Sequence, residues 1–234
     1  MNLVKIQNKY IIIGDIHGRG NWVSTEKYIK EGYKIIFLGD YMDTHDDIPL
    51  LEIHNNFLEI IHFKEDYPDD IILLVGNHDY SYLNLLGECS GYRHQTQSFV
   101  NNYKELFLNN LKVLYRDGEF LFSHAGVSPI YIDENNLTLE DLEKMKCDND
   151  NLRFVWRDIH TNYYGDNNYQ SPIWIRPESL ILSTKNFPYK QVVGHTPCRN
   201  DEDYHYENKI FLNDRLYFNQ VMKVENNEVE LIYL

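Results

Sequence analysis

The sequence predicts an α/β fold, with parallel strands joined by helices in the first half and hairpins in the second. Between residues 10 and 75, three short apolar runs alternate with two segments of helical character. Parallel strands need a long crossover connection, so this alternation indicates a parallel sheet with helices packed against it. After residue 110, turn signals separate short apolar runs, which indicates antiparallel pairing.

Three strands and two helices are expected in the first half. Strands are expected at 10–13, 35–38 and 71–75. The first connection, 21–30, should form a helix that stops at Gly32. The second connection opens at Pro49 and places apolar residues at helical spacing as far as about Lys64, which makes it the clearest helix in the sequence.

The second half contains two predicted hairpins and one short helix. The first hairpin pairs 111–115 with 119–123 around Asp117-Gly118, and the second pairs 216–224 with 228–234 around Asn226-Asn227. An acidic helix is expected at 138–146. Because no fixed repeat and no linker interrupts the chain, we expect one domain over residues 1–234.

Composition excludes several classes of function. The chain has 234 residues and a formal net charge of -14, which disfavours binding to a nucleic-acid backbone because such binding needs a basic face. Its three cysteines are widely spaced and include no CxxC pair, so we expect a reduced, cytoplasmic protein without a disulfide framework. No apolar run approaches the length of a membrane span, and no membrane association is expected.

The segment Gly14 to Gly18, GDIHG, directly follows the first strand. If the extended backbone continues past Gly14, Asp15 and His17 project to the same side, close enough to share a metal ion. A single DxH pattern is more often a polar turn after a core strand than a ligand pair. The pattern gains weight only because the rest of the chain repeats it.

Four more predicted strands end in metal-ligand residue types. Their motifs are GDYMD at 39–43, GNHD at 76–79, SHAG at 123–126 and VGHTP at 193–197. In open α/β sheets, ligands bind in the crevice outside the carboxyl ends of the strands. We therefore expect the five strand ends to meet at one site.

These five motifs, in this order from Gly14 to Pro197, resemble the signature of the phosphoprotein-phosphatase group of the calcineurin-like metallophosphoesterases, particularly the small bacterial and bacteriophage serine/threonine phosphatases. The resemblance implies a two-layered mixed β-sandwich flanked by helices. The hairpins of the second half suit a mixed second sheet.

The resemblance also implies two divalent metal ions. It assigns Asp15 and His17 to one ion, Asp40 to a bridge between the ions, and the other ion to Asn77, His124 and His195. Carboxylate, amide and imidazole ligands suit manganese, our first choice, and also iron, zinc, nickel or cobalt. Two cations about 3.5 to 4 Å apart lower the pKa of a shared water, so that hydroxide can attack phosphorus directly.

Two further residues match the positions with which the family protonates the leaving group. His78 corresponds to the general acid that protonates the departing oxygen, and Asp43 to the carboxylate that orients its ring. The alternatives are a supporting role for His78 and a turn role for Asp43. Asp79 stands where many relatives carry glutamate, and we expect it to orient its neighbours rather than bind metal.

One phosphate-binding residue of the family is missing. The common second motif continues with an arginine after its second aspartate, whereas this chain has Thr44 and His45 there. Arg176, in a Trp-x-Arg segment, and Arg19 are expected to bind phosphate, because arginine presents a planar pair of donors. A surface charge or a structural salt bridge is the alternative for each.

We therefore expect a phosphomonoesterase of the serine/threonine phosphatase type, acting on a phosphorylated protein or a small phosphorylated molecule. A hydrolase of dinucleoside polyphosphates or another small nucleotide is the main alternative. It would need a pocket for a base, which the loop with Tyr163, Tyr164 and Tyr169 could form. A binding module without turnover is the third alternative, and the complete ligand set argues against it.

Overall fold

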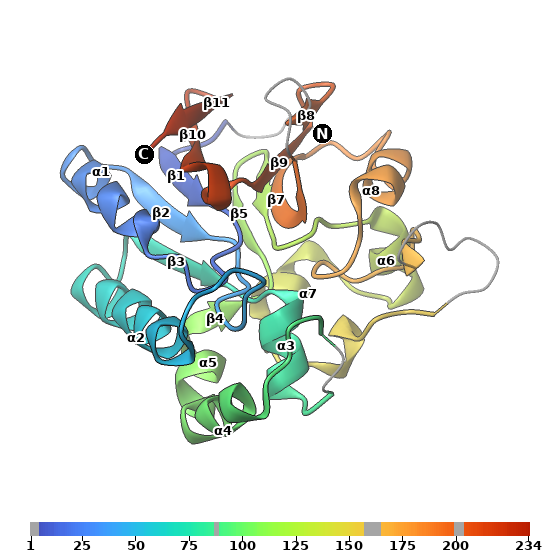
Figure 1. Cartoon of the computed structure of the whole chain (residues 1–234). Helices are drawn as coiled ribbons and strands as arrows, with labels where there is room; N and C mark the ends of the chain where they lie inside the picture. Colours follow the sequence, from blue (N-terminus) through green and yellow to red (C-terminus); the bar gives the residue numbers. More distant parts are fainter. Residues whose placement is uncertain (1–4, 87–88, 157–164, 199–203) are drawn as a thin grey trace.

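Two mixed β-sheets lie at the centre of the computed structural model, with helices on both outer faces (Figure 1). The structure describes residues 5–86, 89–156, 165–198 and 204–234. Figure 1 shows α1 and α2 on one side of the strands and α6 and α8 on the other. The α/β fold expected from the sequence, a mixed two-layered sandwich flanked by helices, is confirmed.

The first sheet has the order β11-β10-β1-β2-β3-β4. Strands β1 to β4 run parallel, β10 is antiparallel to β1, and β11 is antiparallel to β10. Its strands, in chain order, are β1 Tyr10–Ile13, β2 Lys34–Phe37, β3 Ile71–Leu74, β4 Leu111–Lys112, β10 Gln220–Glu225 and β11 Glu228–Tyr233.

The second sheet has the order β5-β6-β7-β9-β8. Strands β6, β7 and β9 run parallel, and the two edge strands are antiparallel to their neighbours. Its strands are β5 Tyr115–Asp117, β6 Phe120–Phe122, β7 Lys190–Pro197, β8 His205–Tyr206 and β9 Ile210–Asp214.

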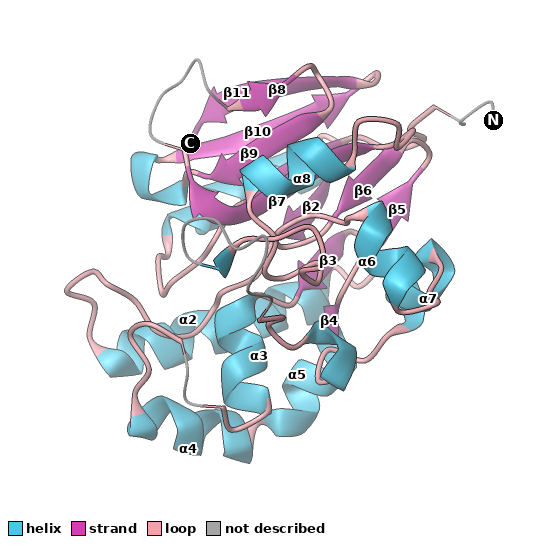
Figure 2. Ribbon diagram, turned by 90° about the vertical axis from the view of Figure 1, so that its right-hand side faces the viewer, coloured by secondary structure: helices cyan, strands magenta, loops and turns pink. Residues whose placement is uncertain are grey.

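The helices are short apart from α2, the connection between β2 and β3 (Figure 2). The α-helices are α1 Glu26–Lys30, α2 Leu50–Asp66, α3 Asn77–Leu83, α4 His94–Asn102, α5 Lys104–Asn110, α6 Pro129–Glu134, α7 Leu139–Lys144 and α8 Pro177–Ser183. The 3-10 helices with bounds inside the described residues are η1 Asn21–Thr25, η2 Asp150–Leu152 and η4 Leu216–Phe218. In the described part of the chain, no helix has both the length and the apolar character that a membrane crossing requires.

Alternation along the central strands divides the core into layers. In β1, Tyr10 and Ile12 pack between the two sheets, whereas Ile11 and Ile13 pack in the cluster that includes the α2 residues. Successive side chains of a strand point to opposite faces, so a strand covered on both sides is apolar throughout. All four residues of β1 are fully buried. Their packing fixes the position at which the chain leaves the sheet at Gly14.

The predicted strands and the long helix of the first half are found within one or two residues, whereas the helix predicted at 21–30 is divided into η1 and α1. The tail hairpin is confirmed as β10–β11, although its first strand begins at Gln220 and residues 216–218 form η4. The other predicted hairpin is wrong in its first strand. Residues 111–112 join the first sheet beside β3, and β5 pairs with β6 across a turn at Gly118-Glu119. The chain therefore changes sheets between 112 and 115, which a local turn signal does not reveal.

Candidate metal centre

Four of the five motif segments line one cavity of about 280 Å³, at the carboxyl ends of the central strands. His124 of the remaining motif, SHAG, is fully buried and lies 2.9 Å from Asn77, which lines the cavity. Asp15 and His17 follow β1, Asp40 follows β2 and Asn77 follows β3. The second sheet supplies His124 after β6 and His195 from within β7. The cavity is lined by Asp15, His17, Asp40, His45, Asn77, His78, Cys89, Ser90, Trp174, Arg176, His195, Pro197 and Asp214.

The first group of side chains is formed by Asp15, His17 and Asp40, whose possible ligand atoms all lie within 4.8 Å of one another. The strand does not continue through this motif, contrary to the sequence prediction. It ends at Ile13, and His17 has a φ of 44°. A turn, rather than strand parity, therefore brings His17 beside Asp15.

The second group is centred on the side-chain oxygen of Asn77. His124 Nε2 and His195 Nδ1 each lie 2.9 Å from Asn77 Oδ1. His124 Nε2 is also 3.4 Å from Asp40 Oδ2, so Asp40 lies between the two groups. This is the arrangement that the motif resemblance implies for a bridging carboxylate.

The tautomer of His124 leaves its second ring nitrogen free to bind a cation. His124 Nδ1 lies 2.9 Å from the Leu38 carbonyl, which accepts its proton. Nε2 then presents a lone pair to Asn77 Oδ1 and Asp40 Oδ2, which are also acceptors. Burial lowers the pKa of His124, and burial together with the neighbouring His124 lowers that of His195 well below its usual range. Both rings are therefore neutral, the form that binds metal.

The spacing and charge of the groups fit metal ions. Ligand atoms bound at about 2.1 Å and at right angles lie about 3 Å apart, close to the 2.9 Å separations around Asn77. Burial and the negative charge of Asp40 raise the pKa of Asp15 to about 7. Cations between these carboxylates would offset the repulsion that adds to the effect of burial.

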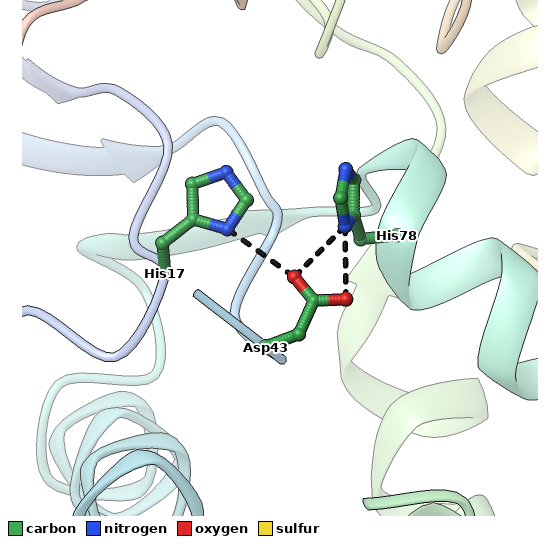
Figure 3. A group of neighbouring side chains, drawn as sticks. All are labelled: His17, Asp43 and His78. Atoms are coloured by element: carbon green, nitrogen blue, oxygen red, sulfur yellow. Dashed lines mark hydrogen bonds and ion pairs between the residues drawn. The ribbon is translucent and has the colours of Figure 1, made fainter. Parts of the chain in front are cut away.

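His78 and Asp43 form a close pair at the edge of the cavity (Figure 3). His78 Nδ1 lies 2.8 Å from Asp43 Oδ1 and 2.9 Å from Oδ2, while Nε2 lies 4.0 Å from Asp40 Oδ2. Burial opposes a charge on His78, but Asp40 and Asp43 outweigh it and raise the pKa of the ring well above its usual value. Figure 3 also shows His17 directed at the same carboxylate. The pair can hold a proton next to the cavity.

Asp79 holds the backbone around the ligands. Its carboxylate accepts the N–H groups of Asp40, Tyr41 and Gly76, each at 2.9 Å. This fixes the end of β2 relative to the start of α3. The contacts match the orienting role expected for this position.

A family model of the calcineurin-like phosphoesterases matches residues 9–232. The chain belongs to the calcineurin-like phosphoesterase family. As a member, it is a metal-dependent hydrolase of phosphoesters. A search of curated proteins gives no match.

Solved structures of phosphatases share the fold. One is the cold-active protein-tyrosine phosphatase of a psychrophilic Shewanella species, with a TM-score of 0.64 and 19% identity over 96% of this chain and 77% of that one. Another is a Saccharomyces cerevisiae protein serine/threonine phosphatase with similarity to human phosphatase PP5, with a TM-score of 0.61 and 14% identity over 97% of this chain and 80% of that one. Such identities support the calcineurin-like fold and leave the substrate open.

The two arginines expected to bind phosphate in this calcineurin-like site have different surroundings. Arg176 lines the cavity, and its guanidinium donates to Thr196 Oγ1 at 3.3 Å. Arg19 is bound to the Asp46 carboxylate at 2.9 Å through Nε and 2.8 Å through a terminal nitrogen. It lines an adjoining cavity instead.

Asp214, which the sequence analysis overlooked, also lines the calcineurin-like cavity. It is the last residue of β9, and burial together with Asp15 raises its pKa to about 8. The segment Ile210–Asp214, IFLND, is also an apolar run that ends in polar residues, like the strands that precede the five motifs. That signal could have identified it.

The raised pKa values predict how the stability of the metal-free protein depends on pH. Asp15 and Asp79, at about 7, and Asp214, at about 8, bind protons more tightly when folded. Each stabilises the fold fully below about pH 4 and loses this contribution as the pH rises through its folded pKa. We expect chelator-treated protein to unfold at lower urea concentration at pH 8.5 than at pH 7.

The histidines do not reverse this trend in that window. Burial lowers the pKa of His17, but Asp43 and Asp40 outweigh burial and raise this pKa to about 9. The contribution of His17 to stability is therefore also lost as the pH rises. His124 and His195 have lowered pKa values, so their contributions are lost only as the pH falls below about 6.5. Saturating Mn²⁺ should reduce the difference. An equal or higher midpoint at pH 8.5 in metal-free protein would contradict these assignments.

Proposed function

We propose that this chain is a phosphomonoesterase that uses two divalent metal ions, and that its substrates are phosphoproteins of the serine/threonine type. The observation that carries the proposal is the convergence of two ligand groups on Asp40, beside the His78–Asp43 pair. The family supplies the reaction class. The order and spacing of the motifs support the serine/threonine type.

Asp15, His17 and Asp40 would hold one ion, and Asp40, Asn77, His124 and His195 the other. Manganese is the first choice, and iron, zinc, nickel or cobalt suit the same ligands. When bound, such ions supply positive charge for the phosphate and make hydroxide available near neutral pH. The three cysteines are buried and form no disulfide, which supports a reducing compartment such as the cytoplasm.

The remaining steps belong to side chains of this chain. Arg176 is placed to bind a phosphate oxygen, because it lines the cavity together with the ligands. His78 holds a proton for the departing oxygen, and Asp43 keeps the ring oriented and charged through Nδ1. Asp79 fixes the backbone that carries Asp40.

Chelator-stripped protein should hydrolyse an aryl phosphate only after manganese is restored. Asp40→Asn should abolish turnover, because it removes the shared negative charge. His78→Ala should lower kcat by about 10² to 10⁴, the usual contribution of a general acid, with a smaller effect on activated aryl esters. The assay is steady-state release of the phenolate.

His62→Ala is the matched control, because His62 is an exposed histidine of α2 that does not line the cavity. It should retain wild-type rates. Folded, metal-loaded protein that hydrolyses no aryl phosphate with any divalent metal would contradict the general phosphomonoesterase. That result would favour a selective nucleotide hydrolase or a binding module instead.

A second cavity favours one alternative, hydrolysis of a dinucleoside polyphosphate or another small nucleotide. It measures about 500 Å³ and shares His17, His45, Pro197 and Asp214 with the metal centre. Tyr217 and Phe218, 63% and 39% exposed, form its aromatic wall. The base pocket imagined at Tyr169 is untested, because Tyr163 and Tyr164 lie outside the described residues.

The two substrate classes can be separated through Tyr217. If a nucleotide is the substrate, diadenosine tetraphosphate should be hydrolysed faster than a phosphoserine peptide, and Tyr217→Ala should raise its KM about tenfold through lost stacking. Tyr233→Ala, an exposed tyrosine of β11, is the control. A preference for the phosphopeptide with no effect of Tyr217→Ala supports the serine/threonine type.

A further inference from the structure

The 280 Å³ cavity of the metal centre, here called the phosphate cavity, has few permanently cationic side chains to bind an anion. Of the described residues that line it, Arg176 is the only arginine or lysine. Three carboxylates, Asp15, Asp40 and Asp214, face the same space. A phosphate bound between metal ions still exposes oxygens on its protein side, and these need N–H or O–H donors.

Arg19 is not available for this task in the observed arrangement. Two of its guanidinium nitrogens bind Asp46, and a third lies 3.4 Å from the Asp15 carbonyl oxygen. Its planar face lies over the ring of Tyr217, with 5.4 Å to the ring centroid. Moving it into the phosphate cavity would break a two-nitrogen ion pair.

The loop after Asp43 explains why a different residue reaches the cavity. Thr44 is buried, and its hydroxyl accepts the N–H of Asp46 at 3.0 Å. This short turn places Asp46 beside Arg19. His45, which lies between Thr44 and Asp46 in the chain, is exposed. His45 lines both the phosphate cavity and the adjoining one.

We propose that His45 is a phosphate-binding residue, donating an imidazole N–H to a substrate oxygen alongside Arg176. Its Nε2 lies 3.3 Å from the Ser90 hydroxyl, which also lines the cavity and can hold the ring in place. Because His45 is two residues from Asp43, the same loop positions both the proton-donating pair and the phosphate donor. The inference rests on the proposed function, in that it takes the 280 Å³ cavity as the phosphate site.

The test measures phosphate binding directly as well as turnover. Inorganic phosphate is titrated into manganese-loaded wild-type, His45→Ala, His45→Arg and His62→Ala proteins by calorimetry, and KM and kcat are measured with an aryl phosphate. Loss of a hydrogen bond to an anion should weaken phosphate binding and raise KM about tenfold in His45→Ala. His45→Arg should stay within about threefold of wild type, because it restores a donor, and kcat should change less than KM.

Phosphate affinity of His45→Ala within about twofold of wild type and His62→Ala would overturn the proposal. So would a His45→Arg protein that binds phosphate no better than His45→Ala, because the role would then not be donation to an anion. A wild-type protein that binds phosphate but hydrolyses no ester defeats the proposed function, while the affinities still decide the role of His45.

Discussion

The buried negative charge of Asp40 is the constraint on which the rest of the site depends. Asp40 is 2% exposed; its Oδ1 accepts the N–H of His78 at 3.0 Å, and its Oδ2 lies 3.4 Å from His124 Nε2. An ionised carboxylate taken out of water costs several kcal/mol unless it is paired and hydrogen-bonded. Asp15 is buried nearby and adds to the negative charge. The imidazole and amide groups around Asp40, together with the proposed cations, offset this buried negative charge.

This convergence requires strained backbone conformations at some residues and glycine at others. His17, Asp40 and Asp43 have φ values of 44°, 54° and 58°, in the left-handed region that side chains with a Cβ rarely occupy. A Cβ on Gly76 would lie 2.0 Å from Asp40 Oδ1, and one on Gly194 would lie 2.2 Å from Asp15 Oδ1. The carboxylates therefore lie against the bare backbone of Gly76, which precedes α3, and of Gly194, within β7. Fully buried strands such as β1 hold these turns in place.

Local patterns predicted the strands and their polar ends, because burial on both faces leaves an apolar run that stops where the chain leaves the sheet. They did not predict how Asp15 and His17 meet, since the turn at His17 depends on contacts with the end of β2. Asp214 was overlooked although its strand has the same form. The pairing of Arg19 with Asp46 joins residues 27 positions apart, and the second cavity joins that pair to Tyr217. Such contacts are set by tertiary packing, which spacing along the chain does not encode.

Metal content tests the central claim most directly. Metal-free protein is dialysed against Mn²⁺, its manganese is counted per chain, and crystals are examined by anomalous diffraction at the manganese edge. The account predicts two ions per chain, about 3.5 to 4 Å apart, on either side of Asp40. A single ion, or ions bound away from Asp15 and Asn77, would contradict it.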